Sequence, residues 1–246
     1  MGTVASLHVH DDVSSDVVDA VSANVWDELD RLERLFSTFR LESEVSRIND
    51  GSLHLLDASA EVLEVLDLCT WLEQISDGAF CARRPADHAI DPAGFVKGWA
   101  AQKASHALDR AGLNNWYLSV GGDLQTRGQS SDGPWRVAIA DPTSSDPEAL
   151  RAVIDVVDEA VATSGTSQRG AHLWDGRSRQ APAHDIVSMT VVGPNLVWAD
   201  AFATTAFVLG RAGIDWVAQF AGYRALAITA DGGLVHLAGS FARPAA

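Results

Sequence analysis

The segment NLVWADAFATTAFVLG, residues 195–210, constrains the fold more than any other part of the chain. Its length and its apolar side chains predict a helix that belongs to the core of the protein. A carboxylate, Asp200, lies inside this apolar run, and the hydroxyl of Thr204 follows four residues later. Because residues four apart share one face of a helix, we expect these two side chains to lie together.

Two interpretations of this pair stay open on the residues alone. A carboxylate and a hydroxyl on one face offer hard oxygen ligands, which suit Mg²⁺ better than a softer metal. Alternatively, Asp200 caps the helix and Thr204 bonds back to a backbone carbonyl. Capping is the commoner use of such an Asp, so the pair by itself favours the second interpretation.

The remaining segments alternate between helical and strand-like patterns without a regular βαβ repeat. Residues 91–98 are expected to form a Pro/Gly loop. Further helices are expected over 15–36 with Ser15 as N-cap, 59–77 with Gly78 as the stop, 99–111 and 214–223. Strands are expected over 3–10, 116–120, 135–142, 187–194, 224–229 and 234–238, with one or two more over 152–165. This mixture favours the α+β class, with one compact domain over 1–246 whose mixed, largely antiparallel sheets are packed by helices.

The formal net charge of −15 disfavours nucleic acid as a partner, because phosphate binding needs clustered Lys and Arg and this chain has two lysines. The two cysteines, Cys69 and Cys81, make no disulfide framework and fit a reducing compartment. No run of about 18 apolar residues predicts a membrane span, and the first residues lack the pattern of a signal peptide. We therefore expect a cytoplasmic protein, with export behind a leader absent from this sequence as the alternative.

The stretch IDPAGFVKGWAA, residues 90–101, is a candidate anion site. Small residues such as Gly94 let a backbone approach a ligand closely, and a helix N-terminus favours anions. Lys97 adds a point charge that suits phosphate. The spacing is not that of a Walker A motif, and a plain turn with a solvated Lys is the equally open alternative.

Two glycine-containing turns and one long polar loop complete the candidates. Gly121, Gly122 and Asp123 follow one predicted strand, and Thr163, Ser164 and Gly165 end another; in isolation, both sets are typical of plain turns. The loop over 167–185 contains His172 and Asp175, and long loops in compact domains are often functional. The chain has neither a GxSxG nor a GxGxxG motif, so nothing points to an acyl hydrolase or a Rossmann dehydrogenase.

Taken in order, these motifs resemble those of the ApbE-type FAD:protein FMN transferases over nearly the whole chain. The matching stretches are MGT at the start, FSTFRLESEVSRIN, SDGAF, DPAGFVKGWAAQ, SVGGD, AVATSG and ADAFATTAFVLG. The resemblance implies that family's fold, which is related to the T-fold. It also implies Mg²⁺-dependent transfer of FMN from FAD to a Thr or Ser hydroxyl of an acceptor protein, with release of AMP. Hydrolysis of FAD to FMN and AMP, or FAD binding without turnover, are the alternatives.

The resemblance also assigns roles to residues. It implies a Mg²⁺ site formed by Gly94, Asp200, Ala203 and Thr204. It implies catalytic roles for Lys97, Asp200 and, as general base, His172. It implies FAD contacts from Met1, Ala79, Phe80, Asp91, Lys97, Gly121, Gly122, Asp123, Thr163, Ser164, Gly165 and Trp174.

The sequence departs from the family pattern in three places. Cys81 stands where an Asp is usual, and Thr166-Ser167 replaces an Asp-Tyr pair. In the loop HLWDGRSR, His172 and Asp175 match the pattern, whereas Pro, Thr and Gly are replaced by Gly176, Ser178 and Arg179. The resemblance therefore implies an intact half for Mg²⁺ and pyrophosphate and an altered half for the acceptor.

Overall fold

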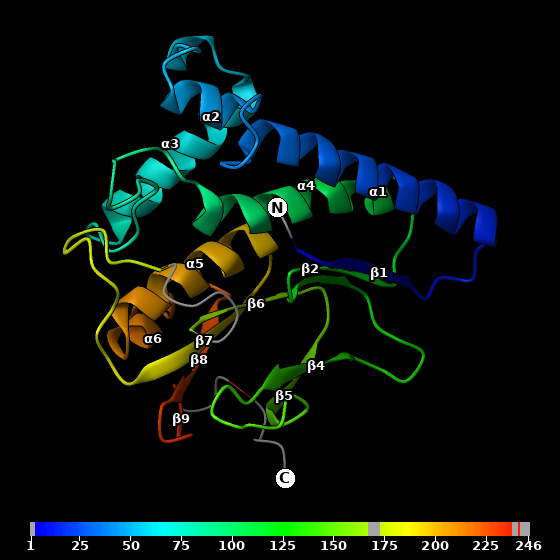
Figure 1. The fold of residues 1–246 in the computed structure, drawn as a ribbon. Coiled ribbons are helices and arrows are strands. Elements are labelled where there is room, and N and C mark those ends of the chain that lie inside the picture. The colour runs from blue at the N-terminus through cyan, green and yellow to red at the C-terminus, as the bar shows by residue number, and fades with distance from the viewer. Residues whose placement is uncertain (1–2, 167–172, 238–240, 242–246) are drawn as a thin grey trace.

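The computed structural model describes residues 3–166, 173–237 and 241 (Figure 1). Its helices are α1 (Ser15–Phe36), α2 (Glu44–Asn49), a 3₁₀ turn (Leu55–Asp57), α3 (Ala60–Ile75), α4 (Ala93–Arg110), α5 (Leu196–Leu209) and α6 (Ala212–Val217). Its strands are β1 (Ala5–Val9), β2 (Trp116–Val120), β3 (Asp123–Arg127), β4 (Trp135–Ala140), β5 (Leu150–Val156), β6 (Ala160–Gly165), β7 (Ile186–Gly193), β8 (Arg224–Thr229) and β9 (Leu234–His236).

The strands form one large sheet and one hairpin. The sheet has seven strands in the order β1-β2-β3-β6-β7-β8-β9, and β4 pairs with β5 as a separate two-stranded sheet. Neighbouring strands are antiparallel in every pair of the described residues. The α+β class with antiparallel sheets is thus confirmed, while the described sheets contain no parallel pair and so are not mixed.

The sheet separates two hydrophobic cores. The helices cover one face and the β4–β5 hairpin covers the other (Figure 1). Alternation along β6 shows the division, because Ala160 and Ala162 belong to the helix-side core and Val161 to the hairpin-side core. Successive residues of one strand therefore serve different layers, and only the even-numbered ones of β6 can reach the helices.

Helix α5 is the buried helix that the apolar run predicts. It packs against α4, β6 and β7, and nearly all its residues are buried. Its N-cap is Asn195, whose Oδ1 accepts a hydrogen bond from the Trp198 N–H at 3.2 Å. Thr205, not Thr204, donates back to a carbonyl of its own helix, that of Ala201 at 2.8 Å. The interpretation of Asp200 as the cap, with Thr204 bonded to the backbone, is therefore wrong.

Helix α4 begins earlier than the sequence predicts. The expected loop over 91–98 ends at Pro92, which is the N-cap, and the helix starts at Ala93. Proline is well suited to a helix start, and the Asp91 carboxylate accepts a hydrogen bond from the Ala93 N–H at 3.2 Å. As a result, Lys97 and Gly98 lie inside the helix and not in a loop.

The other differences are small. The N-cap of α1 is Ser14 instead of Ser15, within the usual scatter of helix ends. Helix α6 spans residues 212–217, so only the first part of the predicted 214–223 helix is α-helical. Among the described residues, no helix combines the length and the hydrophobicity that a membrane span requires.

Candidate active site

Helices α4 and α5 approach each other most closely at Gly98. A Cβ at this position would lie 2.6 Å from the Leu196 carbonyl oxygen and 2.7 Å from the Asp200 Cβ. The Gly98 N–H donates a hydrogen bond of 2.8 Å to Oδ2 of Asp200. Only glycine permits this contact, which brings the carboxylate of α5 against the backbone of α4.

Three charged side chains meet at this contact. The ammonium of Lys97 forms an ion pair with Asp123 and lies 3.3 Å from Oδ1 of Asp200. Both carboxylates are only 2% exposed. Among the described residues, Lys97 is the one cation that contacts both. When both carboxylates are ionised, the cluster therefore keeps one negative charge that its own residues do not neutralise.

Asp123 reaches the cluster because of the turn before it. Val120 and Asp123 pair across the β2–β3 hairpin, and Gly121 and Gly122 form its turn with φ of 64° and 91°. Such positive φ values explain the two glycines. Oδ1 of Asp123 also accepts a hydrogen bond from the Thr163 N–H at 3.0 Å. The sequence presents a plain hairpin turn and a site residue as alternatives. The structure has the hairpin turn, and Asp123 at its end also belongs to the charged cluster.

Burial changes the pKa of Asp200 more than any charge does. Removal from water raises its pKa to about 7, and the negative charge of Asp123 acts in the same direction. The charge of Lys97 and the Gly98 N–H act against this rise. For Lys97, burial alone would lower the pKa, but Asp200 and Asp123 outweigh it and hold the pKa of the ammonium above its usual range. The cluster is therefore short of positive charge.

The oxygen atoms around Asp200 fit a hard divalent cation. Thr204 lies on the same face of α5, and its Oγ1 is 3.1 Å from Oγ of Ser164 on β6. A Cβ on Gly94 would lie 3.3 Å from Cγ2 of Thr204, so the α4 backbone lies close to the Thr204 side chain. Ala203, the second backbone position that the resemblance implies, is fully buried on the same helix. Carboxylate, hydroxyl and carbonyl oxygens suit Mg²⁺.

Among the described residues, no group of three His, Cys, Asp or Glu side chains could hold a metal ion. A cation here would therefore depend on one carboxylate, a hydroxyl and backbone carbonyls. This donor set is compatible with Mg²⁺, which usually keeps part of its water shell.

The predicted flavin-contacting residues divide into two groups. Phe80 belongs with the cluster, since a Cβ on Gly94 would lie 3.3 Å from its ring. Asp91 stands at the start of α4, and Ala79 directly precedes Phe80. By contrast, the Thr163 hydroxyl bonds to that of Thr190 at 2.8 Å on the sheet face opposite the helices. Thr163 thus contributes only its N–H to the cluster.

Gly165 and Trp174 complete the predicted contacts among the described residues. Gly165 ends β6, where a Cβ would lie 2.6 Å from the Val187 carbonyl oxygen. The indole nitrogen of Trp174 is buried without a hydrogen-bond partner among the described residues. Met1 and His172 lie outside the described residues, so their predicted roles stay predictions.

The segment 173–180, which holds three of the departures from the family pattern, packs behind Phe80. The Gly176 N–H donates to the Ala79 carbonyl at 3.1 Å. A Cβ on Gly176 would lie 2.4 Å from the Gly78 carbonyl oxygen and 2.6 Å from the Cβ of Cys81. Gly176 is therefore required by this packing, and Cys81 forms part of the surface that it packs against.

Sequence reasoning did not single out Asn49, which fixes the backbone just before Asp91. Its side-chain amide donates to the Ile90 carbonyl at 2.9 Å, and its Oδ1 accepts from the Ile90 N–H at 2.7 Å. The signal was present, because Asn49 ends the matching stretch FSTFRLESEVSRIN. Its long-range partner could not be found from local spacing.

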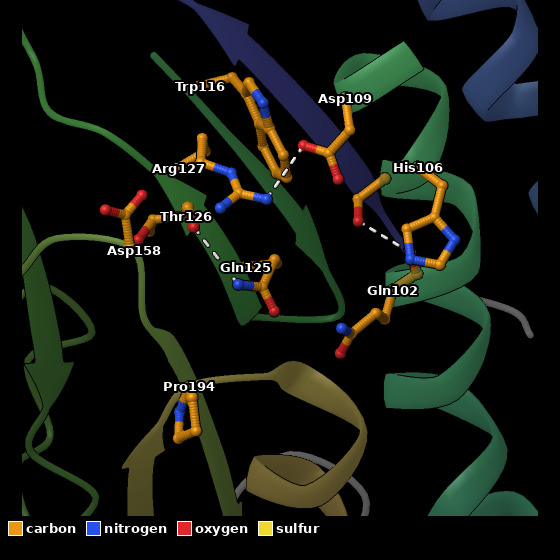
Figure 2. A pocket seen from close by; sticks show the side chains of 10 residues that line it. Gln102, His106, Asp109, Trp116, Gln125, Thr126, Arg127, Asp158 and Pro194 are labelled. Atoms are coloured by element: carbon orange, nitrogen blue, oxygen red, sulfur yellow. Dashed lines mark hydrogen bonds and ion pairs between the residues drawn. The ribbon is translucent and has the colours of Figure 1, made fainter. Parts of the chain in front are cut away.

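A cavity of about 150 Å³ lies apart from the cluster (Figure 2). Its walls come from α4, from β2 and β3, and from the segments just before β6 and α5. The lining residues are Gln102, Ser105, His106, Asp109, Trp116, Gln125, Thr126, Arg127, Asp158 and Pro194. None of the predicted site residues is among them, so the candidate active site is the charged contact of α4 with α5 and not this cavity.

The protein is thus an α+β protein with a buried, anionic site. Helices α4 and α5 form one side of this site, and the carboxylate of Asp123 at the β2–β3 turn forms the other. The chain belongs to the ApbE family, whose model matches residues 1–84 and 81–227. The predicted family is thereby confirmed.

Individual relatives agree with this assignment. The FAD:protein FMN transferase of Escherichia coli K12 is 32% identical over 155 residues, which are 59% of this chain and 44% of that protein. That of Rhodobacter capsulatus is 35% identical over 156 residues, which are 59% of this chain and 29% of that protein. The matched segment thus spans less than half the length of these relatives.

Solved structures support the fold. The flavin transferase ApbE from Vibrio cholerae superposes with a TM-score of 0.81 at 23% identity, over 98% of this chain and 94% of that one. The ApbE protein from Thermotoga maritima gives a TM-score of 0.77 at 22% identity, over 96% and 94%. At these identities the likeness establishes the architecture alone.

Proposed function

We propose that this protein transfers FMN from FAD to a Thr or Ser hydroxyl of an acceptor protein, in a Mg²⁺-dependent reaction that releases AMP. Family membership supports the proposal, as does the name of the relatives that the chain matches, FAD:protein FMN transferase. We also propose that the chain acts as one domain in the cytoplasm. The substrate, the cation and the acceptor are all parts of this proposal.

The observation that carries the proposal is the uncompensated charge at the contact of α4 with α5. Asp123 and Asp200 are both buried, and Lys97 alone among the described residues contacts both. A buried charge is costly unless it is paired, so the cluster favours an additional cation. With a divalent cation the net charge would become positive, which suits the pyrophosphate of FAD.

Each residue of the cluster has a chemical task in this proposal. Asp200, Thr204 and the carbonyls of Gly94 and Ala203 would hold Mg²⁺, which when bound neutralises charge on pyrophosphate oxygens. Lys97 places a fixed positive charge in the same buried region, where it can stabilise negative charge that develops during phosphoryl transfer. Asp123 keeps Lys97 in place by its ion pair. The proton of the acceptor hydroxyl needs a base within reach, for which His172 is the proposed residue.

Hydrolysis of FAD by water is the second candidate. The altered segment 173–180 favours it, because Gly176, Ser178 and Arg179 replace family residues in the half assigned to the acceptor. The cluster of Lys97 and the two carboxylates would serve both reactions equally. Only the identity of the attacking oxygen distinguishes them.

The test is to incubate the protein with FAD and Mg²⁺, with and without a peptide that carries a flavinylation threonine, and to measure AMP by chromatography. We expect AMP only with the peptide, together with a fluorescent, covalently modified peptide. AMP without the peptide would assign hydrolysis instead. Bound FAD with no AMP in either mixture would reject both activities and leave a flavin-binding protein.

A further inference from the structure

Two residues with an unfavourable backbone conformation contact each other through their side chains. Among the described residues other than glycine, only Asp77, His88, Asp158 and Arg179 have positive φ. His88 and Arg179 both have φ of 60°, and Nη1 of Arg179 lies 2.6 Å from Nε2 of His88. Side chains rarely persist in this backbone region unless the surrounding structure requires them. The contact between two such residues, far apart in sequence, therefore suggests a role for the side chains.

The Arg179 side chain is held from several directions. Its Nη2 donates to the carbonyl of Arg84 at 3.3 Å and also to that of Pro85. The backbone N–H of Arg179 donates to the Asp175 carbonyl at 2.6 Å, and the Asp175 N–H donates to the Gln180 carbonyl at 2.8 Å. Residues 175–180 thus form a tight turn. From this turn the side chain of Arg179 extends to the 84–88 segment.

The 84–88 segment leads directly into the candidate site. Arg84 N–H donates to the Ala89 carbonyl at 2.9 Å, and Asp91 N–H donates to the Ala82 carbonyl at 2.8 Å, so residues 82–91 form a closed loop. One end of this loop follows Phe80 and the other end carries Asp91 into α4. Arg179 donates hydrogen bonds to the tip of the loop, and the Gly176 N–H donates one to Ala79, just before the loop begins.

We propose that Arg179 is a positioning residue that fastens the 173–180 segment to the 82–91 loop and thereby sets the spacing between Phe80 and Asp91. The inference rests on the proposed function, because these two residues are the proposed contacts of FAD. Arg179 acts through His88 and the carbonyls of residues 84 and 85, without touching FAD. Arg179 stands where the family pattern that this chain resembles has Gly.

Three substitutions separate positioning from stability. Arg179→Ala removes the side chain and keeps the backbone strain, whereas Arg179→Gly removes both. Gly accepts positive φ freely, so Arg179→Gly is expected to have the higher Tm of the two. FAD affinity, measured by quenching of flavin fluorescence, is expected to fall roughly tenfold in both, as for the loss of one charged hydrogen bond. Arg211→Ala is the control, because Arg211 pairs with Asp185 on an exposed surface away from the site.

The route through His88 is tested by a double-mutant cycle. We expect His88→Ala to weaken FAD binding, and Arg179→Ala to cause a smaller further loss in that background, because the bonds of Arg179 to the carbonyls of residues 84 and 85 remain. A full additional loss would mean that Arg179 acts independently of His88 and would overturn the route through His88. Wild-type FAD affinity in Arg179→Gly would overturn the inference itself. If the wild-type protein binds no FAD, the proposed function fails first, and that result differs from every outcome of the variants.

Discussion

At the scale of single residues, Asp200 holds the site together through two interactions. It accepts a hydrogen bond from the Gly98 N–H, and it lies beside the Lys97 ammonium, which also pairs with Asp123. Burial above all raises the pKa of Asp200 to about 7, against the opposing charge of Lys97. A carboxylate in such a place is costly for stability, which is typical of functional sites.

The substitution Asp200→Asn tests this account. The amide oxygen can still accept the Gly98 hydrogen bond, so we expect a folded protein whose Tm is unchanged or higher. Loss of the charge is expected to lower AMP formation on the order of 100-fold or more, because charge stabilisation by a metal is worth several kcal/mol. Calorimetric titration with Mg²⁺ and AMP chromatography measure the two effects. A variant that retains wild-type Mg²⁺ affinity would remove Asp200 from the proposed metal site.

At the scale of elements, helix α5 is placed by side chains from two neighbours. Oε1 of Gln125 on β3 accepts a hydrogen bond from the Leu196 N–H at 2.9 Å, and Oε1 of Gln102 on α4 accepts one from the Val197 N–H at 3.2 Å. Both glutamines line the cavity near Pro194, just before the start of α5 (Figure 2). Together with Asn195 they satisfy the first N–H groups of α5, which no residue of the helix itself can do.

Gln125→Leu is therefore expected to lower the free energy of unfolding by about 1–3 kcal/mol, the usual cost of a buried donor without an acceptor. Urea denaturation measures this change. Gln219→Leu, at an exposed position of similar chemistry, serves as the control and is expected to change stability by less than about 0.5 kcal/mol. Equal effects of the two substitutions would show that Gln125 does not support α5.

Glu61 connects three helices on the outer side of the molecule. It accepts hydrogen bonds from Arg31 of α1 at 2.7 Å and 2.9 Å and from Lys103 of α4 at 3.0 Å. The hydrogen bond from Arg31 is the main cause that lowers the pKa of Glu61 to about 2, and Lys103 adds to it. The Glu61 side chain is 24% exposed, so solvent screening limits the gain to about 1 kcal/mol.

The pH dependence follows from the direction of this shift. A lowered pKa in the folded protein gives stability that is complete above the unfolded value, near 4.5, and is lost as the pH falls toward about 2. Glu61→Gln is thus expected to cost about 1 kcal/mol at pH 7, with the difference shrinking between pH 4.5 and pH 2. Asp30→Asn, which removes an exposed pair with Arg34, should change little at any pH. A constant difference for Glu61→Gln down to pH 2 would contradict the assignment.

At the scale of the whole molecule, the site forms where the helical layer, the sheet and the segment 173–180 meet. The helical layer supplies Lys97 and Asp200, the sheet supplies Asp123 and Ser164, and the segment 173–180 closes the side near Phe80. Residues from the middle and the last third of the chain become neighbours only in this arrangement (Figure 1). Three of the departures from the family pattern lie in the closing segment, and none of the departures replaces Lys97, Asp123 or Asp200.

The local sequence pattern therefore predicted the helices and strands better than the contacts between them. The apolar run around Asp200 was sufficient to predict a buried helix, because hydrophobic spacing is a property of neighbouring residues. It did not predict the role of Asp200, since the pair with Thr204 by itself favoured a helix cap. The start of α4 was placed too late, since Pro and Gly near a helix start resemble a loop in sequence. The pairing of Lys97 with Asp123 and Asp200, and the support of α5 by Gln102 and Gln125, depend on tertiary approach and leave no local signal.

The most direct test of the central claim is the mass of an acceptor after incubation with this protein, FAD and Mg²⁺. The account predicts that the acceptor gains the mass of one FMN, that one AMP appears for each modified acceptor, and that Asp200→Asn gives neither. AMP in excess over the modified acceptor would show that water is the main acceptor. Full modification by Asp200→Asn would contradict the claim that the buried carboxylate between α4 and α5 is the centre of the reaction.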